Sequence, residues 1–271
     1  MSIKDKVQYH RVADSADLTL SEGIYTDYRF EPHYHIDFHI GLVVSGVQQQ
    51  KFNGQQVLLG PGRVSIMPPG EIHDGSAYQD PYYRLNTFRI TQDMLDEHFL
   101  DIFDRHRSVS FAGAMLDDAI LSKQLSHLFS LIKGTGELSS LPVEENWLKV
   151  LHPILSQLNQ SKAPEIKGGL SGKHWDWINE YCREHMADKI TLAQLGSISG
   201  LSRYQLLRRF EKTIGITPHA WLTQLRLEYA CRMLRKSDEH IANIATNVGF
   251  YDQSHFNRAF KNAYGVAPSK Y

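Results

Sequence analysis

The C-terminal part of the chain contains one pattern twice, and this repeat constrains the fold more than any other feature. Residues 192–218 resemble residues 241–268, at an offset of 49 before an internal turn and 50 after it. The matching positions are Leu192, Leu195, Gly200, Leu206, Arg208, Phe210, Gly215 and Pro218 in the first copy and Ile241, Ile244, Gly249, Phe256, Arg258, Phe260, Gly265 and Pro268 in the second. Such a repeat predicts one supersecondary unit built twice.

Each copy has the pattern of a helix-turn-helix unit. A short apolar helix ends at a glycine, and Ser202 or Asp252 then caps a longer helix. In the first long helix Leu206, Phe210 and Ile214 share one face, and Phe256 and Phe260 do so in the second.

The opposite faces of the two long helices are polar. They hold Arg203, Tyr204, Leu207 and Arg208 in the first copy, and Gln253, Ser254, Asn257 and Arg258 in the second. These side chains suit contacts with phosphates and base edges. The alternative is a plain helical bundle in which the arginines form a solvated face.

A single helix is predicted between the copies. Thr217 caps it, Pro218 occupies its first turn, and about 19 residues at 1.5 Å each give a length of roughly 28 Å. A rigid helix of that length would hold two recognition helices about one DNA turn, roughly 34 Å, apart.

Charge divides the chain in the same way. The 271 residues carry a net charge of -1, which by itself argues against a nucleic-acid binder. Residues 1–160 hold 13 basic and 20 acidic residues, net -7, whereas residues 161–271 hold 16 and 10, net +6. The basic part therefore suits a polyanionic partner.

Other classes of protein are not supported. MSIKDKVQYH has no apolar core, so we expect no signal peptide, and no run reaches the roughly 18 apolar residues of a membrane helix. Cys182 and Cys231 form no disulfide framework, which favours a reducing, cytoplasmic setting. We expect no catalytic residues, because no nucleophile–base motif or nucleotide fingerprint occurs.

The N-terminal part has a different texture. Short segments rich in Val, Ile, Tyr and Phe between residues 24 and 90, separated by Gly/Pro turns, predict a small barrel or jelly roll. Helical periodicity follows to residue 158, where Pro153 is expected to kink or divide a helix. Leu121, Leu125 and Leu128 are candidates for a dimer seam or for the core. Residues 159–173 have the composition of a linker.

A histidine cluster stands out in this acidic part. PHYHIDFH places His33, His35, Asp37 and His39 on one face if the segment is a strand. GRVSIMPPGEIH adds Glu71 and His73. Three hypotheses remain open: a transition-metal site of His33, His35, His39 and His73, a metal-free pocket for a small, anionic effector, or structural histidines.

The motifs together resemble a known family. S-x-x-x-L-x-R-x-F at Ser202–Phe210, the strut RLEYACRML and the segment IATNVGFYDQSHFNRAFKNAYGVAPSKY are similar to the DNA-binding domain of AraC/XylS-type regulators. H-x-H and G-x5-P-x-G-x2-H resemble cupin barrels, except that His39 stands where cupins usually carry glutamate. Gly196 departs from the usual alanine, seen at Ala245, which predicts a softer helix by about 1 kcal/mol.

The resemblance implies an α+β chain and assigns its parts. A cupin-like effector-binding and dimerisation domain would span 1–160, with a barrel over about 10–90 and helices over about 92–158. A linker over 161–172 and a DNA-binding domain over 173–271 would follow. Tyr204, Leu207, Arg208, Ser254, His255 and Arg258 would face bases, whereas Arg203, Lys212 and Lys261 would contact phosphate. His33, His35, His39, Glu71 and His73 would bind the effector.

The expected function is a ligand-responsive transcription regulator. Its expected partners are double-stranded DNA, a small-molecule effector, a second copy of the chain and RNA polymerase, with no membrane. Two alternatives stay open: a metal-dependent cupin enzyme fused to a DNA-binding module, and a ligand-independent DNA-binding protein with a scaffold barrel. The expected cofactor is none, or a divalent transition metal at the histidines.

Overall fold

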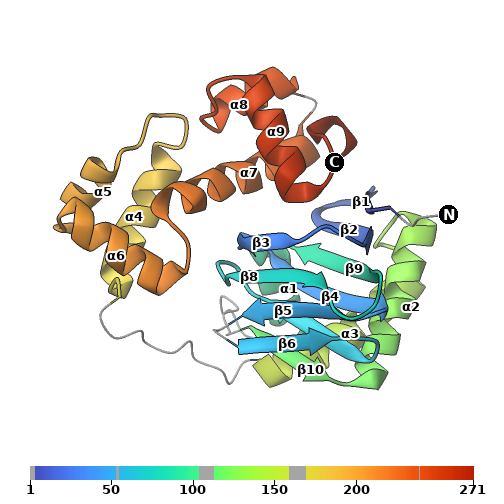
Figure 1. The fold of residues 1–271 in the computed structure, drawn as a ribbon. Coiled ribbons are helices and arrows are strands. Elements are labelled where there is room, and N and C mark those ends of the chain that lie inside the picture. Colours follow the sequence, from blue (N-terminus) through green and yellow to red (C-terminus); the bar gives the residue numbers. More distant parts are fainter. Residues whose placement is uncertain (1–3, 53–54, 104–112, 159–168, 238) are drawn as a thin grey trace. The chain divides into compact units, whose positions relative to one another are not determined.

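The chain forms two compact units, Met1–Ala163 and Pro164–Tyr271 (Figure 1). The computed structural model describes residues 4–52, 55–103, 113–158, 169–237 and 239–271. Residues 161–168 of the predicted linker therefore lie outside the described residues. Leu170 packs into the second unit, where its backbone N–H donates to Thr213 Oγ1 at 2.7 Å.

Two antiparallel sheets form the first unit, so the predicted α+β class is confirmed. The larger sheet has the order β1-β2-β9-β4-β7-β10, from β1 (Lys6–Val12), β2 (Ser15–Tyr25), β9 (Tyr83–Ile90), β4 (Phe38–Ser45), β7 (Arg63–Met67) and β10 (Ala114–Asp117). The smaller has the order β3-β8-β5-β6, from β3 (Phe30–His33), β8 (His73–Ala77), β5 (Gln48–Phe52) and β6 (Gln55–Leu59).

Three helices pack with the six-stranded sheet to make the main core. They are α1 (Gln92–Phe103), α2 (Ala119–Thr135) and α3 (Leu141–Leu158). The Phe88 ring of β9 contacts Phe129 and Trp147, with ring centroids 5.6 and 6.1 Å apart. The helices thus turn the apolar stripes seen in the sequence toward the sheet.

The structure decides between the alternatives expected for these helices. Pro153 does not divide α3, which runs through it; the surrounding apolar side chains, among them Ile154 and Leu155, are buried and offset the backbone hydrogen bond that proline removes. Leu121, Leu125 and Leu128 are at most 3% exposed within one chain, so they pack in its core and are closed to a partner. Exposed apolar residues on α2 and α3 are instead Ile120, Leu141 and Leu148.

Polar side chains bridge the space between the two sheets. Gln48 Nε2 on β5 donates to the Tyr83 hydroxyl on β9 at 3.2 Å, and the Ser65 hydroxyl on β7 donates to Gln50 Oε1 at 3.4 Å. All four residues are buried. Among the described residues, the interior between the sheets therefore holds hydrogen-bonded polar side chains beside a small apolar cluster of Val43, Leu59 and Tyr83.

The second unit is helical and contains both copies of the repeat. Its helices are α4 (Gly172–Glu184), α5 (Leu192–Ser199), α6 (Arg203–Ile214), α7 (Pro218–Lys236), α8 (Ile241–Asn247) and α9 (Gln253–Tyr264), followed by the 3-10 turn η1 (Pro268–Lys270). The predicted caps are confirmed: Ser202, Thr217 and Asp252 each accept a backbone N–H at the start of their helix.

Helix α7 lies between the two helix-turn-helix units, with α5 and α6 toward one end and α8 and α9 toward the other (Figure 1). Aromatic residues hold α4 and α6 on α7: Trp221 contacts Trp175 and Phe210 at ring distances of 5.2 and 5.7 Å. At the other end the Tyr264 hydroxyl of α9 donates to the buried Glu228 carboxylate of α7 at 2.6 Å.

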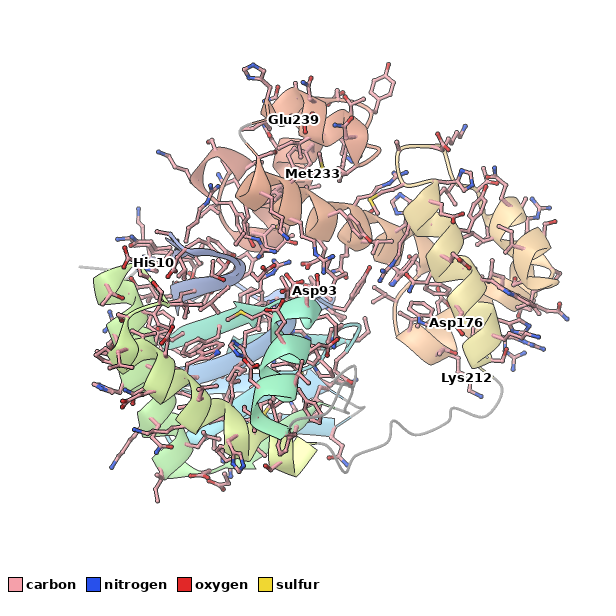
Figure 2. All side chains as sticks on the ribbon, turned by 180° about the vertical axis from the view of Figure 1, so that it is seen from behind. His10, Asp93, Asp176, Lys212, Met233 and Glu239 are labelled. Carbon is pink, nitrogen blue, oxygen red and sulfur yellow. The ribbon has the colours of Figure 1, made fainter. Side chains whose placement is uncertain are left out.

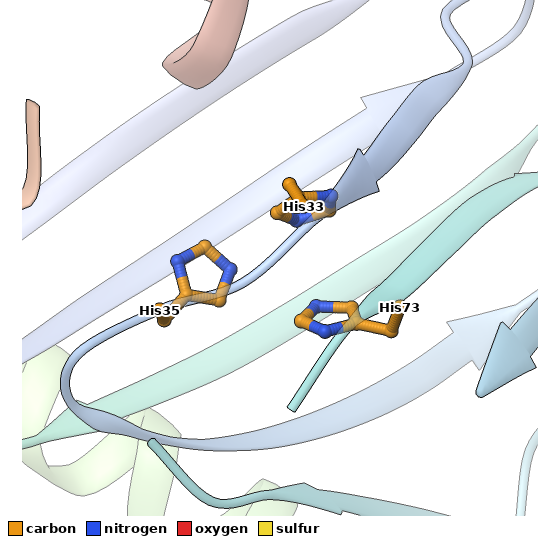
Figure 3. Close-up of side chains that lie close together, drawn as sticks. All are labelled: His33, His35 and His73. Carbon is orange, nitrogen blue, oxygen red and sulfur yellow. The ribbon is translucent and has the colours of Figure 1, made fainter. Parts of the chain in front are cut away.

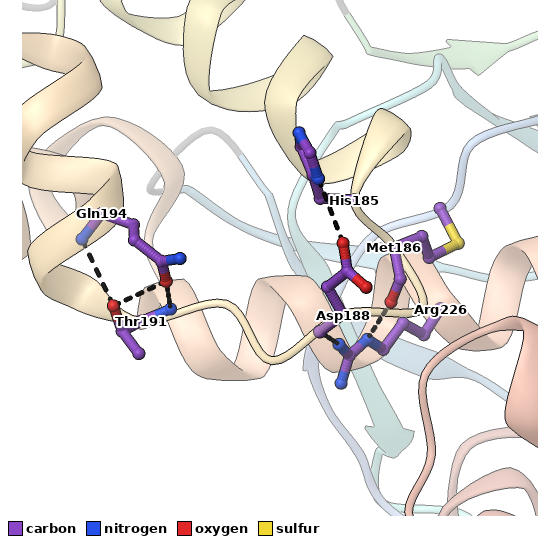
Figure 4. A network of polar contacts seen from close by, with 6 residues as sticks. All are labelled: His185, Met186, Asp188, Thr191, Gln194 and Arg226. Atoms are coloured by element: carbon purple, nitrogen blue, oxygen red, sulfur yellow. Dashed lines mark hydrogen bonds and ion pairs between the residues drawn. The ribbon is translucent and has the colours of Figure 1, made fainter.

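The loop between α4 and α5 is fastened to α7 by Arg226 (Figure 4). Its Nε donates to the Met186 carbonyl at 3.1 Å, and its Nη2 donates to the Asp188 carbonyl at 2.8 Å. Gly249, in the turn after α8, packs against the Met186 carbonyl and the Arg226 guanidinium so closely that a Cβ there would overlap them. The two helix-turn-helix units thus meet at this loop.

Gly196 in α5 has a related explanation. A Cβ at this position would lie 2.7 Å from the Leu201 carbonyl oxygen. The glycine that departs from the family pattern therefore permits a close approach of the turn after α5. Among the described helices, none is long and apolar enough to cross a membrane.

Candidate nucleic-acid interface and effector site

Helices α6 and α9 present the same amphipathic arrangement. Leu206 and Phe210 of α6, and Phe256 and Phe260 of α9, are fully buried. Nine of the eleven predicted DNA-contacting residues are exposed, including Lys212 in the last turn of α6 (Figure 2): Arg203, Tyr204, Arg208, Lys212, Gln253, Ser254, His255, Arg258 and Lys261. Leu207 and Asn257 are partly buried at the edges of these faces. Each helix therefore offers one polar, basic face to solvent.

One exposed aromatic residue was missed by the sequence analysis. Tyr251 precedes the cap residue Asp252 of α9 and is 95% exposed. A tyrosine hydroxyl beside a recognition helix can donate to a phosphate oxygen. The sequence signal for this residue was an aromatic side chain in the turn after Gly249, where a solvent-exposed position does not require one for packing.

Three of the predicted histidines come together in the N-terminal unit. His33 ends β3 and His73 begins β8, where the two residues face each other in register. His35 follows β3, and one nitrogen from each of the three rings lies within 4.8 Å of the others (Figure 3). The ring centroid of His33 is 4.4 Å from that of His73 and 4.9 Å from that of His35.

The structure corrects the expected strand through these histidines. β3 ends at His33 and β4 begins at Phe38, so His35 and Asp37 lie in the connection between the two sheets. Asp37 does not share the face: it is buried and accepts from Arg89 Nε at 2.8 Å. His39 stacks flat on His35 at a centroid distance of 3.6 Å, and its buried Nε2 has no hydrogen-bond partner among the described residues.

Backbone carbonyls orient two of the rings. His33 Nδ1 lies 2.8 Å from the Glu31 carbonyl, and His73 Nδ1 lies 3.0 Å from the Glu71 carbonyl. Because a carbonyl only accepts, each Nδ1 carries the proton. Burial, together with neighbouring histidines, holds the pKa of His73 and that of His39 well below the ordinary value. Both imidazoles are therefore neutral at pH 7.

Glu71 takes part through its backbone more than through its side chain. Its carboxylate accepts from the backbone N–H of Gly113, and burial raises its pKa. It is outside the group of nitrogens that lie within 4.8 Å of one another. The predicted effector set therefore splits into a histidine cluster and a carboxylate directed toward Gly113.

Three cavities among the described residues are lined by none of His33, His35, His39 and His73. One of them, about 540 Å³, is lined by Arg29, Lys51 and Asp74 among others. Two of about 390 Å³ lie beside Lys133 and beside Trp147. The histidine cluster brings several imidazole nitrogens close together, and this makes it the stronger candidate for a ligand site.

Comparison with known proteins assigns both units. Residues 15–151 match the AraC-like ligand binding domain, and residues 195–271 match a helix-turn-helix domain. The first match alone covers just over half of the chain. The chain belongs to the AraC family of transcriptional regulators. The family resemblance predicted from the sequence is therefore confirmed.

Curated relatives extend over most of this AraC-family chain. The uncharacterized HTH-type transcriptional regulator YbfI of Bacillus subtilis is 26% identical over 231 residues, which is 84% of this chain and 81% of YbfI. The arabinose operon regulatory protein of Salmonella typhimurium is 27% identical over 243 residues, which is 86% of this chain and 82% of that protein.

Solved structures show the same fold. Apo ToxT from Vibrio cholerae, in a lysine variant, superposes with a TM-score of 0.62 at 12% identity, covering 95% of this chain and 97% of ToxT. Wild-type ToxT bound to an unsaturated fatty acid superposes with a TM-score of 0.59 at 13% identity, covering 100% and 96%. With its AraC-like ligand binding domain and its helix-turn-helix domain, the chain is a DNA-binding transcription regulator with an N-terminal ligand-binding domain, as predicted.

Proposed function

We propose that α6 and α9 enter two major grooves of the operator. Tyr204, Leu207 and Arg208 face bases in one groove, and Ser254, His255 and Arg258 face bases in the other. Gln253 and Asn257 border the second set. Arg203, Lys212, Tyr251 and Lys261 contact phosphates. The single observation that carries this proposal is the matching exposure of the two polar faces above buried aromatic cores.

The effector binds at the histidine cluster of the first unit. His33, His35, His39 and His73 supply imidazole groups at a partly exposed site, and the Glu71 carbonyl orients the His73 ring. Because these rings are close enough to converge on one small group, they suit a compact polar molecule better than a large apolar one.

The polar interior supports the same choice of effector. ToxT binds an unsaturated fatty acid in one of its solved structures. In this chain Gln48, Gln50 and Ser65 occupy the space between the sheets and hydrogen-bond across it. Burying an acyl chain there would leave these groups unpaired at a cost of roughly 1–3 kcal/mol each. A small carboxylic acid at the histidines avoids that cost.

Effector binding controls transcription by favouring one arrangement of the molecule over another, a coupling typically worth about 1–3 kcal/mol. We propose that the chain acts in the cytoplasm as a homodimer on paired sites, with RNA polymerase as a further partner. We assign it no catalytic reaction, since its relatives are transcription regulators.

Thermal unfolding with a panel of small carboxylic acids tests the effector site. A ligand that binds the native state raises the melting temperature by mass action. We expect the shift to be lost in His73→Asn, which removes one ring nitrogen from the site. Lys51→Ser, in the 540 Å³ cavity, is the matched control and should keep the shift. Loss of the shift in Lys51→Ser alone would move the effector to that cavity.

A further inference from the structure

His33, His35 and His73 have the composition and spacing of a metal-ligand set. They come from the end of β3, the connection after it and the start of β8, and their ring nitrogens lie within 4.8 Å of one another (Figure 3). Imidazole nitrogens alone favour zinc and the neighbouring first-row transition metals over calcium or magnesium, which prefer oxygen ligands.

Two of the three rings are already oriented as metal ligands usually are. The Nδ1 protons of His33 and His73 are donated to the Glu31 and Glu71 carbonyls. Each ring therefore keeps its lone pair on Nε2. A ring N–H bonded to a backbone carbonyl is the typical arrangement behind a ligating histidine, since it fixes the tautomer and raises the basicity of the other nitrogen.

His39 stacks on the His35 ring. Its ring lies parallel to that of His35, with an angle of 12° between the ring planes. This stacking limits the rotation of His35, and the buried, unpartnered Nε2 of His39 adds a polar atom to the same region.

We propose that His33, His35 and His73 bind one divalent transition-metal ion, zinc or a metal of similar preference. Zn–N bonds of about 2.0–2.1 Å place tetrahedral nitrogens roughly 3.3 Å apart, so the rings draw closer when the metal binds. Three histidines leave one coordination position open. Where the proposed function holds, that position takes a donor atom of the anionic effector.

Cobalt(II) titration of the full chain, without an affinity tag and after chelator treatment, tests the site. We expect one Co²⁺ per chain, visible absorption typical of tetrahedral coordination, and displacement by Zn²⁺. His73→Asn retains a side-chain donor for the Glu71 carbonyl but loses Nε2, and should weaken Co²⁺ binding by at least about 100-fold. His127→Asn, at an exposed position on α2, is the matched control and should bind like the native chain.

Less than one Co²⁺ per chain in the native protein would overturn the proposal. So would binding of Co²⁺ by His73→Asn and His33→Asn with the affinity of the native chain. Circular dichroism melts of the metal-free variants show whether each is folded, and His33→Asn serves if His73→Asn is not. If the effector still raises the melting temperature of metal-free protein, the effector site stands and the metal has no part in it. DNA binding by α6 and α9 is scored separately, so the two failures are distinguishable.

Discussion

Arg208 and Arg203 lie on the same helix and are both exposed, yet they are expected to act differently. Arg208, facing a guanine, would donate two hydrogen bonds to one base edge. Arg208→Ala should weaken specific binding by about 1–3 kcal/mol and relax the sequence preference at one operator position. Arg203→Ala should weaken binding to all sequences alike and lower the salt slope by about 1.

Gel-shift titrations over a range of salt concentrations, on specific and unrelated duplexes, separate the two effects. Arg183→Ala is the control, because Arg183 is exposed on α4, outside both recognition helices, and bonds to Asn179. Unchanged operator affinity in Arg208→Ala would remove this residue from the base-reading set.

At the scale of the element, the two turns of the repeat can be compared directly. Gly200 and Gly249 occupy equivalent positions with φ of 66° and 85°, a conformation that side chains disfavour by roughly 1–2 kcal/mol. A Cβ at Gly200 meets nothing within 4 Å, whereas one at Gly249 overlaps the Met186 carbonyl. Gly200→Ala should therefore cost about 1–2 kcal/mol, and Gly249→Ala about 1–3 kcal/mol more.

Urea unfolding followed by tryptophan fluorescence measures this difference, because three of the four tryptophans, Trp175, Trp177 and Trp221, belong to the helical unit. Equal losses of stability in the two variants would show that the Gly249 turn moves away from the α4–α5 loop without cost.

Helices with local signals could be predicted from the sequence, and strands held by distant partners could not. The cap residues and buried faces of α6 and α9 depend on neighbours within one or two turns. β8 has the sequence HDGSA, with no strand-favouring residue, and forms because β3 and β5 pair with it on either side. β1 and most of β2 were missed because their polar faces hide the alternation.

The histidine site shows the same limit. Even spacing places His33, His35 and His39 on one face only if a single strand continues through them. The chain bends between the sheets instead, and the third close partner, His73, arrives through cross-strand pairing. In α2 the leucine spacing cannot separate a core stripe from a dimer seam, because both bury the same apolar surface.

Over the whole molecule, opposite charges separate the two tasks. The basic half carries both recognition helices, and the acidic half is repelled by phosphate. Residues 170–271 alone should bind DNA with an affinity that falls steeply with salt, by a slope of about 0.9 per phosphate neutralised, whereas residues 1–160 should show no binding. Fluorescence anisotropy with a labelled duplex measures both; binding by residues 1–160 would contradict this division.

Because α7 is one continuous helix of 19 residues, its length fixes the orientation of α9 relative to α6. Each inserted residue would turn α9 by about 100° around the helix axis and move it by about 1.5 Å, so one insertion would aim its polar face away from the DNA that α6 already holds. An insertion between Arg226 and Glu228 would also rotate one of these residues away from its hydrogen-bond partner. We therefore expect α7 to tolerate substitutions of exposed residues but not single-residue insertions or deletions.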